Sequence, residues 1–288
     1  DKDTSRGLGD VYKRQAFYVA SSGRPGPVLV DIPKDIQFQT GTYIGPDTIK
    51  HKSYRPKLKA NIDNIDDALK LIAEAEKPIF YTGGGVINSG NAAVQLLREF
   101  VRLTGFPITS TLQGLGAFPG DDTQFVGMLG MHGTYEANMA MNECDLMINI
   151  GARFDDRITG KIDEFSPNSK KIHIDIDPSS INKVVNVDVA LVGDVAHVLE
   201  DAIKLWKSKV YKVNKSQIKD WWKQIDKWKE RDSLGFNEDK KTIKPQHAIQ
   251  RLYELTKEKD VFVTTEVGQH QMWAAQYYKF NRPNRWIT

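Results

Sequence analysis

Three consecutive glycines, Gly83, Gly84 and Gly85, stand between an apolar run of strand length and a stretch with helical spacing. Glycine leaves its backbone N–H groups bare, and such groups, together with the N-terminus of the following helix, can hold a phosphate. A tight turn after a strand needs the same residues. This feature alone therefore leaves nucleotide binding and a simple turn equally open.

Similar residues recur where further apolar runs end, in segments 130–133, 151–157, 173–177 and 193–194. Ligands of an open parallel sheet bind at the carboxyl ends of its strands. Arg153 and Arg157 can pair with phosphate or carboxylate, and an acid at Asp175 can accept hydrogen bonds from a ribose. Several such strand ends favour an extended dinucleotide, because each half of that ligand needs separate contacts.

Each of these candidates has a structural alternative. Asp155 and Asp156 can serve as ion-pair partners of the neighbouring arginines on a solvated loop. Asp177 is interpreted as the cap of the turn that follows it. His132, among glycines at a helix start, is compatible with a general base, a phosphate donor or a turn residue.

Metal and thiol chemistry have little support. Six scattered histidines and one cysteine give no zinc spacing, so no metal ligand is predicted. Cys144 precedes an apolar run and is interpreted as a core residue. A single cysteine and the absence of a signal-like apolar run favour a soluble protein of a reducing compartment, cytoplasmic or organellar. Gly268, Gln269 and His270 lie between a predicted strand and a predicted helix, which is again a place for a diphosphate.

Alternating helical and strand-like runs over 61–206 predict an α/β fold, a doubly wound parallel sheet covered on both faces. The expected strands are 78–82, 108–112, 146–150, 171–175 and 189–192. Apolar residues at helical spacing predict helices over 93–101 and 195–206. The other regions are interpreted as incomplete pieces of two further α/β domains.

The remaining boundaries follow from composition and period. Residues 1–15 show neither period and are interpreted as disordered or foreign to the fold. Residues 16–40 are expected to end a first domain, with a helix end at 16–20 and a strand at 28–32. Residues 41–60 read as a linker. A connecting helix is predicted within residues 207–245. Residues 246–288 are interpreted as the start of a third domain, with helices at 246–255 and 271–278 and a strand at 261–265.

The connecting region interleaves lysines with tryptophans, which also suits a membrane surface or nucleic acid. A helix that docks its tryptophans on its own protein gives the same pattern, and we favour that interpretation. Lys plus Arg number 40 against 37 for Asp plus Glu, a net charge of +3. This dispersed charge predicts no nucleic-acid or membrane partner.

The run from Gly23 to Asp35 resembles the end of the first domain of thiamine-diphosphate-dependent synthases. Segments 83–85, 110–112, 114–116, 128–133, 153–157 and 173–177 resemble the FAD-binding middle domain of the acetolactate synthase family. Segment 267–276 resembles the opening of that family's cofactor domain. The resemblance extends over 16–288 and identifies the chain as an internal fragment of the large catalytic subunit type.

The resemblance implies a set of site residues. The FAD site would be lined by Arg24, Gly83, Gly84, Gly85, Thr111, Leu112, Met131, His132, Gly151, Arg153, Asp155, Asp175, Ile176 and Asp194. Thiamine diphosphate would touch Val267, Gly268, Gln269 and His270. The channel to the active site would be bordered by Lys34, Met131, Asp156 and Arg157, with Arg157 meeting the carboxylate of the second keto acid.

The implied reaction joins two pyruvates to 2-acetolactate with loss of carbon dioxide, or pyruvate and 2-oxobutyrate to 2-aceto-2-hydroxybutyrate. The implied cofactors are thiamine diphosphate, Mg²⁺ and a structural FAD, and the implied partners are a second copy and a small regulatory subunit. The family's catalytic glutamate would precede Ala16 and its magnesium motif would follow Thr288, so the chain alone is expected to be inactive. Alternatives are a sister carboligase or oxidase, such as glyoxylate carboligase, and a non-catalytic dinucleotide-binding module.

Overall fold

The computed structural model describes residues 4–40, 51, 53–238 and 241–288, with side chains from Tyr12 onward. The chain divides into two compact units, residues 1–57 and 58–288. The division falls beside the domain boundary predicted near Ala60. Most of the predicted linker, 41–60, lies outside the described residues. The two units are described separately.

The larger unit is built on a six-stranded sheet in which every neighbouring pair is parallel. Its strands are β1 Pro78–Thr82, β2 Ile108–Ser110, β3 Phe125–Met128, β4 Leu146–Ile150, β5 Lys170–Asp175 and β6 Val189–Val192. They lie in the order β3-β2-β1-β4-β5-β6. The order reverses between β1 and β4, which is the topological switch point where ligands of such sheets bind. The predicted doubly wound α/β sheet is thus confirmed.

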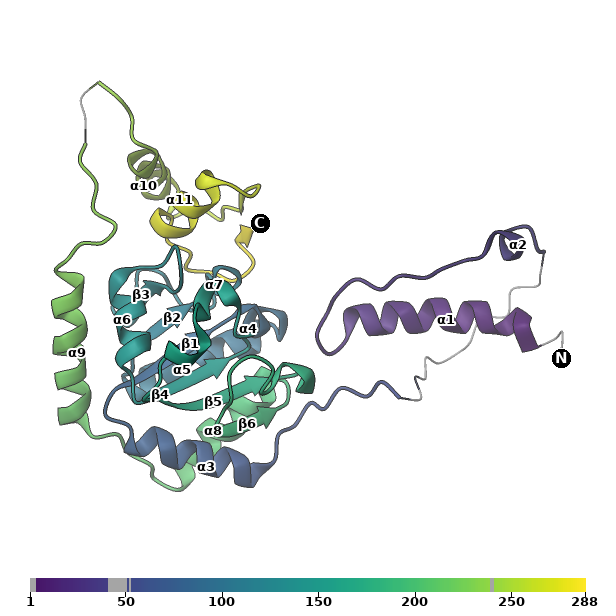
Figure 1. Ribbon diagram of the computed structural model, residues 1–288, viewed down its shortest axis with the longest axis horizontal. Helices are drawn as coiled ribbons and strands as arrows, with labels where there is room; N and C mark the ends of the chain where they lie inside the picture. Colours follow the sequence, from purple (N-terminus) through teal and green to yellow (C-terminus); the bar gives the residue numbers. More distant parts are fainter. Residues whose placement is uncertain (1–3, 41–50, 52, 239–240) are drawn as a thin grey trace. The chain divides into compact units, whose positions relative to one another are not determined.

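Helices cover both faces of this sheet (Figure 1). One face carries α3 Ile62–Glu74, α5 Asn91–Thr104 and α8 Val195–Ser208, whose apolar sides form the larger core with Phe80. The other face carries α6 Tyr135–Glu143 and α9 Lys215–Lys229 around Ile79 and Tyr81. Full burial of side chains of this size stabilises the fold by about 1.5–3 kcal/mol each.

Short elements follow the strands at their carboxyl ends. They are α4 Gly84–Asn88, the 3₁₀ turn η1 Leu112–Gly114, α7 Asp156–Thr159, η2 Ile162–Glu164 and η3 Pro178–Ser180. Strand β2 ends two residues earlier than predicted, because Thr111 leaves the sheet to cap η1. Cys144 is buried as predicted, and burial raises the pKa of its thiol to about 11.

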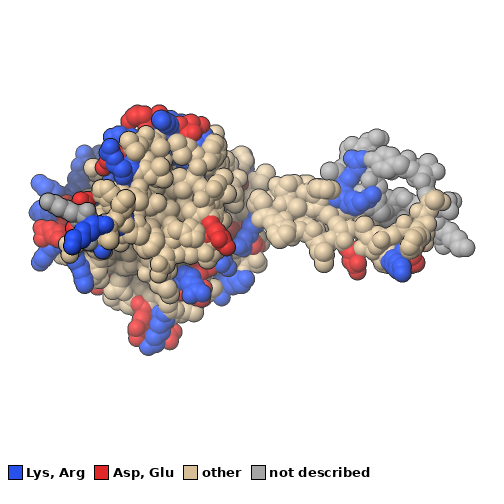
Figure 2. Space-filling model, turned by 90° about the horizontal axis from the view of Figure 1, so that it is seen from above, with Lys and Arg blue, Asp and Glu red and all other residues tan. Residues whose placement is uncertain are grey.

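Helix α9 docks on its own protein, which confirms the favoured interpretation of the tryptophan-rich region. Ile218, Trp221 and Ile225 are buried. The indole N–H of Trp221 donates to the carbonyl of Pro78 at 3.0 Å. Figure 2 shows basic and acidic side chains intermixed on the surface of the larger unit. No helix in the described part of the chain has both the length and the apolar character needed to cross a membrane.

The C-terminal region holds α10 Pro245–Thr256, β7 Val263–Thr264, α11 Gln269–Tyr277 and β8 Trp286–Ile287. These residues lie in the compact unit 58–288 together with the sheet. They contact it through an apolar cluster in which Ala274, Tyr278 and Phe280 pack against Leu115 and Met128. The prediction that they start a third domain stays a prediction. The strand predicted over 261–265 is shorter, because only two of its residues pair with β8.

The smaller unit holds α1 Thr4–Ser21 and α2 Lys34–Gln37. The predicted helix end at 16–20 is confirmed, and residues 4–15 belong to the same helix. The interpretation of residues 1–15 as disordered or foreign to the fold stays a prediction. A helix satisfies its backbone hydrogen bonds locally and does not need an amphipathic period. The strand predicted at 28–32 is wrong. A strand needs a neighbour, the described part of this unit provides none, and Leu29 is 92% exposed.

Candidate functional site

The loops that follow β1 and β4 touch at the switch point. A Cβ atom added to Gly85 would lie 2.7 Å from the Cα atom of Gly151, closer than such atoms ever approach. The N–H of Gly85 donates to the Gly151 carbonyl at 2.9 Å, and the N–H of Gly83 donates to Ile150 at 3.0 Å. Two of the three predicted phosphate-binding N–H groups are therefore engaged within the protein. Only that of Gly84 has no partner among the described residues.

The loop after β2 also packs against the end of β1, beside the two loops that touch at the switch point. A Cβ atom added to Gly114 would lie 2.6 Å from the Ser110 Oγ atom and 2.7 Å from the Thr82 carbonyl oxygen. The N–H of Thr111 donates to that same carbonyl at 2.9 Å, and its hydroxyl oxygen accepts from the Gly114 N–H at 3.1 Å. The predicted residues Thr111 and Leu112 thus lie in a turn that is held against the end of β1.

The segment after β4 carries the predicted arginines. Arg153 forms an ion pair with Asp155. The Asp155 carboxylate also accepts from the backbone N–H of Arg157 at 3.1 Å and caps α7. This hydrogen bond is the main reason why the pKa of Asp155 lies below its usual value. The ion pair named as an alternative is therefore present between Arg153 and Asp155, and their place in a ligand site stays a prediction. Asp156 and Arg157 lie exposed beside them.

The loop after β3 is tied to that segment and to α11. The N–H of Met131 donates to the carbonyl of Arg157 at 3.1 Å. The carbonyl of His132 accepts from the Gln276 side chain at 2.8 Å. Hydrogen bonds therefore link two predicted flavin residues to the predicted substrate arginine and to α11, the helix that begins with two of the predicted diphosphate residues.

Two carboxylates at the ends of β5 and its following turn serve the local fold. Asp175 accepts from the N–H of Asp177 at 2.8 Å, with Ile176 half-buried between them. Asp177 accepts from the N–H of Ser179 at 2.9 Å, which confirms its interpretation as a cap.

The carboxylate of Asp194 makes more hydrogen bonds within the protein than that of Asp175. It accepts from the hydroxyl of Ser89 at 2.9 Å and from the N–H of Ala196 at 3.0 Å. It thereby caps α8 and links that helix to the end of α4. The prediction that Asp194 lines a ligand site remains a prediction.

Two residues that we did not single out from the sequence hold the segment after β4. Asn149 donates to the carbonyl of Ala152 at 2.8 Å and accepts from its N–H at 3.2 Å. The Nε2 atom of His173 lies 3.0 Å from the same carbonyl oxygen. Both side chains are fully buried. Their sequence signal is a polar residue inside an otherwise apolar strand.

The remaining predicted residues lie elsewhere. Gly268 is the extended residue before α11, and Val267, Gln269 and His270 are exposed around it. Arg24 and Lys34 are exposed in the smaller unit. No group of three or more potential metal-binding side chains occurs among the described residues.

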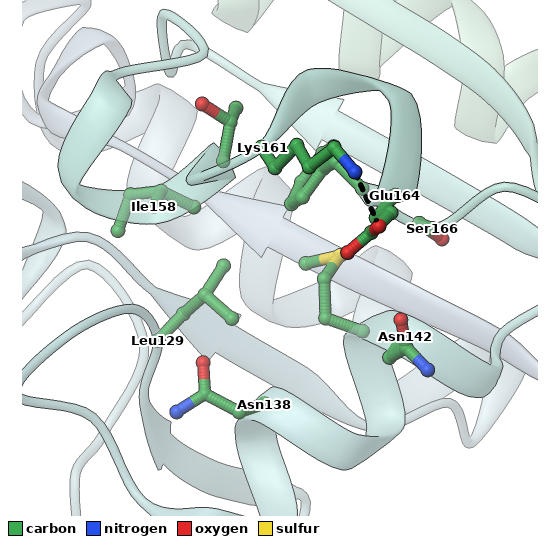
Figure 3. A pocket seen from close by; sticks show the side chains of 10 residues that line it. Leu129, Asn138, Asn142, Ile158, Lys161, Glu164 and Ser166 are labelled. Atoms are coloured by element: carbon green, nitrogen blue, oxygen red, sulfur yellow. Dashed lines mark hydrogen bonds and ion pairs between the residues drawn. The ribbon is translucent and has the colours of Figure 1, made fainter.

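Two cavities flank the loops after β3 and β4. One of about 250 Å³ lies between α6 and segment 158–166, where Lys161 and Glu164 pair at its edge (Figure 3). None of the predicted site residues lines it. The other, of about 160 Å³, lies between β3 and α11 and is lined by His132 and Gln276. Of the two, this second cavity is the one lined by a predicted site residue, His132.

Comparison with known proteins identifies the region that holds the sheet. Residues 65–202, which contain the sheet and its switch point, match the family described as thiamine pyrophosphate enzyme, central domain. Over these residues the chain is similar to the thiamine pyrophosphate enzymes. The chain is also 48% identical over 277 residues to the acetolactate synthase large subunit of Buchnera aphidicola subsp. Schizaphis graminum. It is 45% identical over 277 residues to the acetolactate synthase isozyme 3 large subunit of Escherichia coli.

A plant relative is similar to the same extent. The chain is 45% identical over 278 residues to acetolactate synthase 1, chloroplastic, of Oryza sativa subsp. japonica. Each of these three alignments covers 96% of this chain, but only 48% of the bacterial proteins and 42% of the rice protein. The chain therefore spans about half the length, or somewhat less, of the thiamine pyrophosphate enzymes that it matches.

Proposed function

We propose that this chain supplies the flavin-binding part of an acetolactate synthase large subunit. The complete enzyme would condense two pyruvates to 2-acetolactate with loss of carbon dioxide, or pyruvate with 2-oxobutyrate to 2-aceto-2-hydroxybutyrate. The observation that carries this proposal is the 45–48% identity with acetolactate synthases across 96% of the chain. A match over the sheet alone would support the wider family only.

The residues at the switch point fit a dinucleotide such as FAD. The Gly84 N–H is open to a ligand, and the guanidinium of Arg153 can meet a pyrophosphate charge. Asp175 offers carboxylate oxygen to a ribose hydroxyl. The glycine contacts let the loops after β1 and β4 approach each other closely at the switch point. In this proposal FAD is a structural group.

Thiamine diphosphate with Mg²⁺ would supply the electron sink for decarboxylation. Val267, Gly268, Gln269 and His270 would hold its diphosphate. The support is their place at the start of α11, where the first N–H groups of a helix point outward.

Arg157 is the proposed contact for the carboxylate of the second keto acid. Asp156 beside it, and separately Lys34, are proposed as substrate-channel residues of the complete enzyme. The backbone of Arg157 is held at both ends, by Asp155 through its N–H and by Met131 through its carbonyl. Its guanidinium stays protonated and can bind a carboxylate through two hydrogen bonds. A fixed backbone with an exposed side chain suits that role.

The proposal includes a homodimer and a small regulatory subunit, since the bacterial relatives are named large subunits. It also includes a cytoplasmic or organellar location, in line with the chloroplastic rice relative.

Flavin binding by the purified 288-residue chain is the first test. We expect a flavin spectrum that stays with the protein on gel filtration, and saturable quenching of protein fluorescence by FAD. Riboflavin should bind at least tenfold more weakly, because it lacks the pyrophosphate and the adenosine half. The variant Arg153→Met should weaken FAD binding by about tenfold, while Lys161→Met, exposed on the same side of the sheet, should not.

The reaction itself is tested in a full-length protein that contains this segment. Formation of acetolactate from pyruvate, lost in Arg157→Ala, is expected. Carboligation of glyoxylate without acetolactate would favour a sister carboligase. FAD binding without any release of carbon dioxide would favour a dinucleotide-binding module.

A further inference from the structure

We infer that Asn149 and His173 are positioning residues that aim segment 151–157, and with it Arg153 and Arg157, toward the ligand. The position of the segment is independent of any ligand. The consequence for flavin affinity rests on the proposed function.

The two side chains belong to one polar row across three strands. Tyr81 of β1 pairs in register with Asn149 of β4, which pairs with His173 of β5. Paired residues of parallel strands share a face, and here it is the face that carries α6 and α9. Polar groups buried in such a core need partners, because an unpaired one costs about 1–3 kcal/mol. The backbone of Ala152 provides the partner for both Asn149 and His173.

The geometry fixes the direction of this clamp. The carbonyl oxygen of Ala152 accepts from the Nδ2 atom of Asn149 at 2.8 Å and lies 3.0 Å from the Nε2 atom of His173. A carbonyl can only accept, so Nε2 carries the proton. Two donors use both lone pairs of this oxygen. The Nδ1 atom of His173 is buried and has no hydrogen-bond partner among the described residues. Nε2 also lies 3.6 Å from a carboxylate oxygen of Asp175, so its shorter contact, to the carbonyl of Ala152, is the hydrogen bond of the ring.

The clamp decides which side chains face outward. Ala152 and Phe154 are 3% and 4% exposed, whereas the side chain of Arg153 is 67% exposed. The ring of Phe154 lies 5.2 Å from that of His173 and 6.2 Å from that of Tyr81, measured between ring centres. This alternation places Arg153 and Asp155 on the outer side. A shift of one residue would bury the arginine and expose the phenylalanine.

The experiment measures tryptic cleavage after Arg153 and Arg157 in the 288-residue chain, because this readout needs no ligand. Cleavage at a held segment follows its local opening. His173→Leu and Asn149→Leu should raise the rate at these two bonds by about tenfold. His173→Gln keeps an N–H donor and should restore most of the protection.

Lys171→Met is the matched control. Lys171 is buried two residues before His173 on the same face, but its ammonium donates to the carbonyls of Ser166 and Ser169. This variant should lower stability to denaturant without faster cleavage after Arg153 or Arg157. Far-UV circular dichroism verifies that each variant is folded. If His173→Leu is folded but cleaved no faster at these bonds, or if Lys171→Met is cleaved equally fast, the inference is wrong.

Flavin titration separates this inference from the proposed function. Where the unmodified chain binds FAD, His173→Leu should weaken binding about tenfold and His173→Gln should recover it. An unmodified chain that binds no FAD would contradict the proposed flavin site, while the cleavage result would still decide the inference. If His173→Leu is cleaved faster but binds FAD with unchanged affinity, the inference that this segment is held for flavin binding is wrong.

Discussion

At the scale of single residues, the carboxylates beyond the strands differ in how far the protein already uses them. Asp194 accepts from a hydroxyl and a backbone N–H, and it joins two helices by doing so. Asp175 accepts from one backbone N–H, and its other oxygen lies 3.6 Å from the Nε2 atom of His173, beyond hydrogen-bond distance. Because each ionised carboxylate has four lone-pair positions, Asp175 keeps more capacity for a ligand.

Replacement of Asp194 by alanine should therefore affect stability more than binding. Loss of the α8 cap and of the Ser89 contact should lower the free energy of unfolding by about 1–2 kcal/mol. Urea denaturation followed by circular dichroism measures this. Asp201→Ala, inside the same helix, is the control and should change stability by less than about 0.5 kcal/mol. A large loss of FAD affinity with unchanged stability would instead make Asp194 a ligand residue.

The sequence predicted which residue types lie at the switch point, but not which of their backbone N–H groups bond within the protein. Three glycines between a strand and a helix can be recognised by eye, whereas the engagement of Gly83 and Gly85 depends on a loop almost seventy residues away. Asn149 and His173 escaped notice for a similar reason. Their partner is the backbone of Ala152, an apolar residue whose own sequence position gives no sign of these hydrogen bonds.

At the scale of elements, two helices are fastened by polar side chains over an apolar contact. Trp221 fastens α9 through its N–H, and Trp222 donates in the same way to the carbonyl of Gly105 at 2.8 Å. Asp66 of α3 accepts from Lys209 and Tyr211, just beyond α8. Each contact predicts a measurable effect.

Trp221→Phe keeps the ring but leaves the Pro78 carbonyl without its donor. The expected loss of stability is about 1–3 kcal/mol, because that carbonyl stays buried. Trp222→Phe makes the same chemical change at a half-buried position and should cost less. Both variants, and the unmodified chain, should fail to bind anionic lipid vesicles. Vesicle binding that is lost in Trp221→Phe would revive the membrane interpretation of this helix.

The contact of Asp66 predicts a pH dependence. Its hydrogen bonds with Lys209 and Tyr211 lower the pKa of the carboxyl from 3.8 to about 2. A carboxyl with a lowered pKa in the folded state stabilises the protein above the unfolded value, and this contribution is lost as the pH falls through the folded value. The stability difference between the chain and Asp66→Asn should therefore shrink between pH 4 and pH 2. Thermal unfolding at four or five pH values measures it, and a constant difference would contradict the prediction.

Sequence period located most elements of the sheet and missed those that depend on a neighbour. Strand β3 has only four residues, contains Gly127 at φ 95°, and buries every second side chain at the sheet edge. A run of four residues is too short for its alternation of buried and exposed side chains to be told from the sequence of a loop. The opposite error occurred at 28–32, where a continuous apolar run suggested a strand although the described unit offers it no pairing partner.

At the scale of the whole larger unit, the C-terminal region and the sheet share one apolar cluster. We therefore expect both to unfold together. Urea transitions followed by tryptophan fluorescence and by far-UV circular dichroism should coincide for residues 58–288, and Tyr278→Ala should shift both equally. Two separate transitions, of which Tyr278→Ala shifts only the earlier one, would show that the C-terminal region is an independent folding unit.

The contact between Gly85 and Gly151 has a consequence for inheritance. Every single-base missense change in a glycine codon installs a residue with at least a Cβ atom, and at these two positions that atom would lie 2.7–2.8 Å from the Cα of the other glycine. Gly151 also has φ 63°, which other residues resist. Neither codon therefore has a tolerated missense neighbour, and a library of point variants of this chain sorted for folded protein should contain no missense variant at either position.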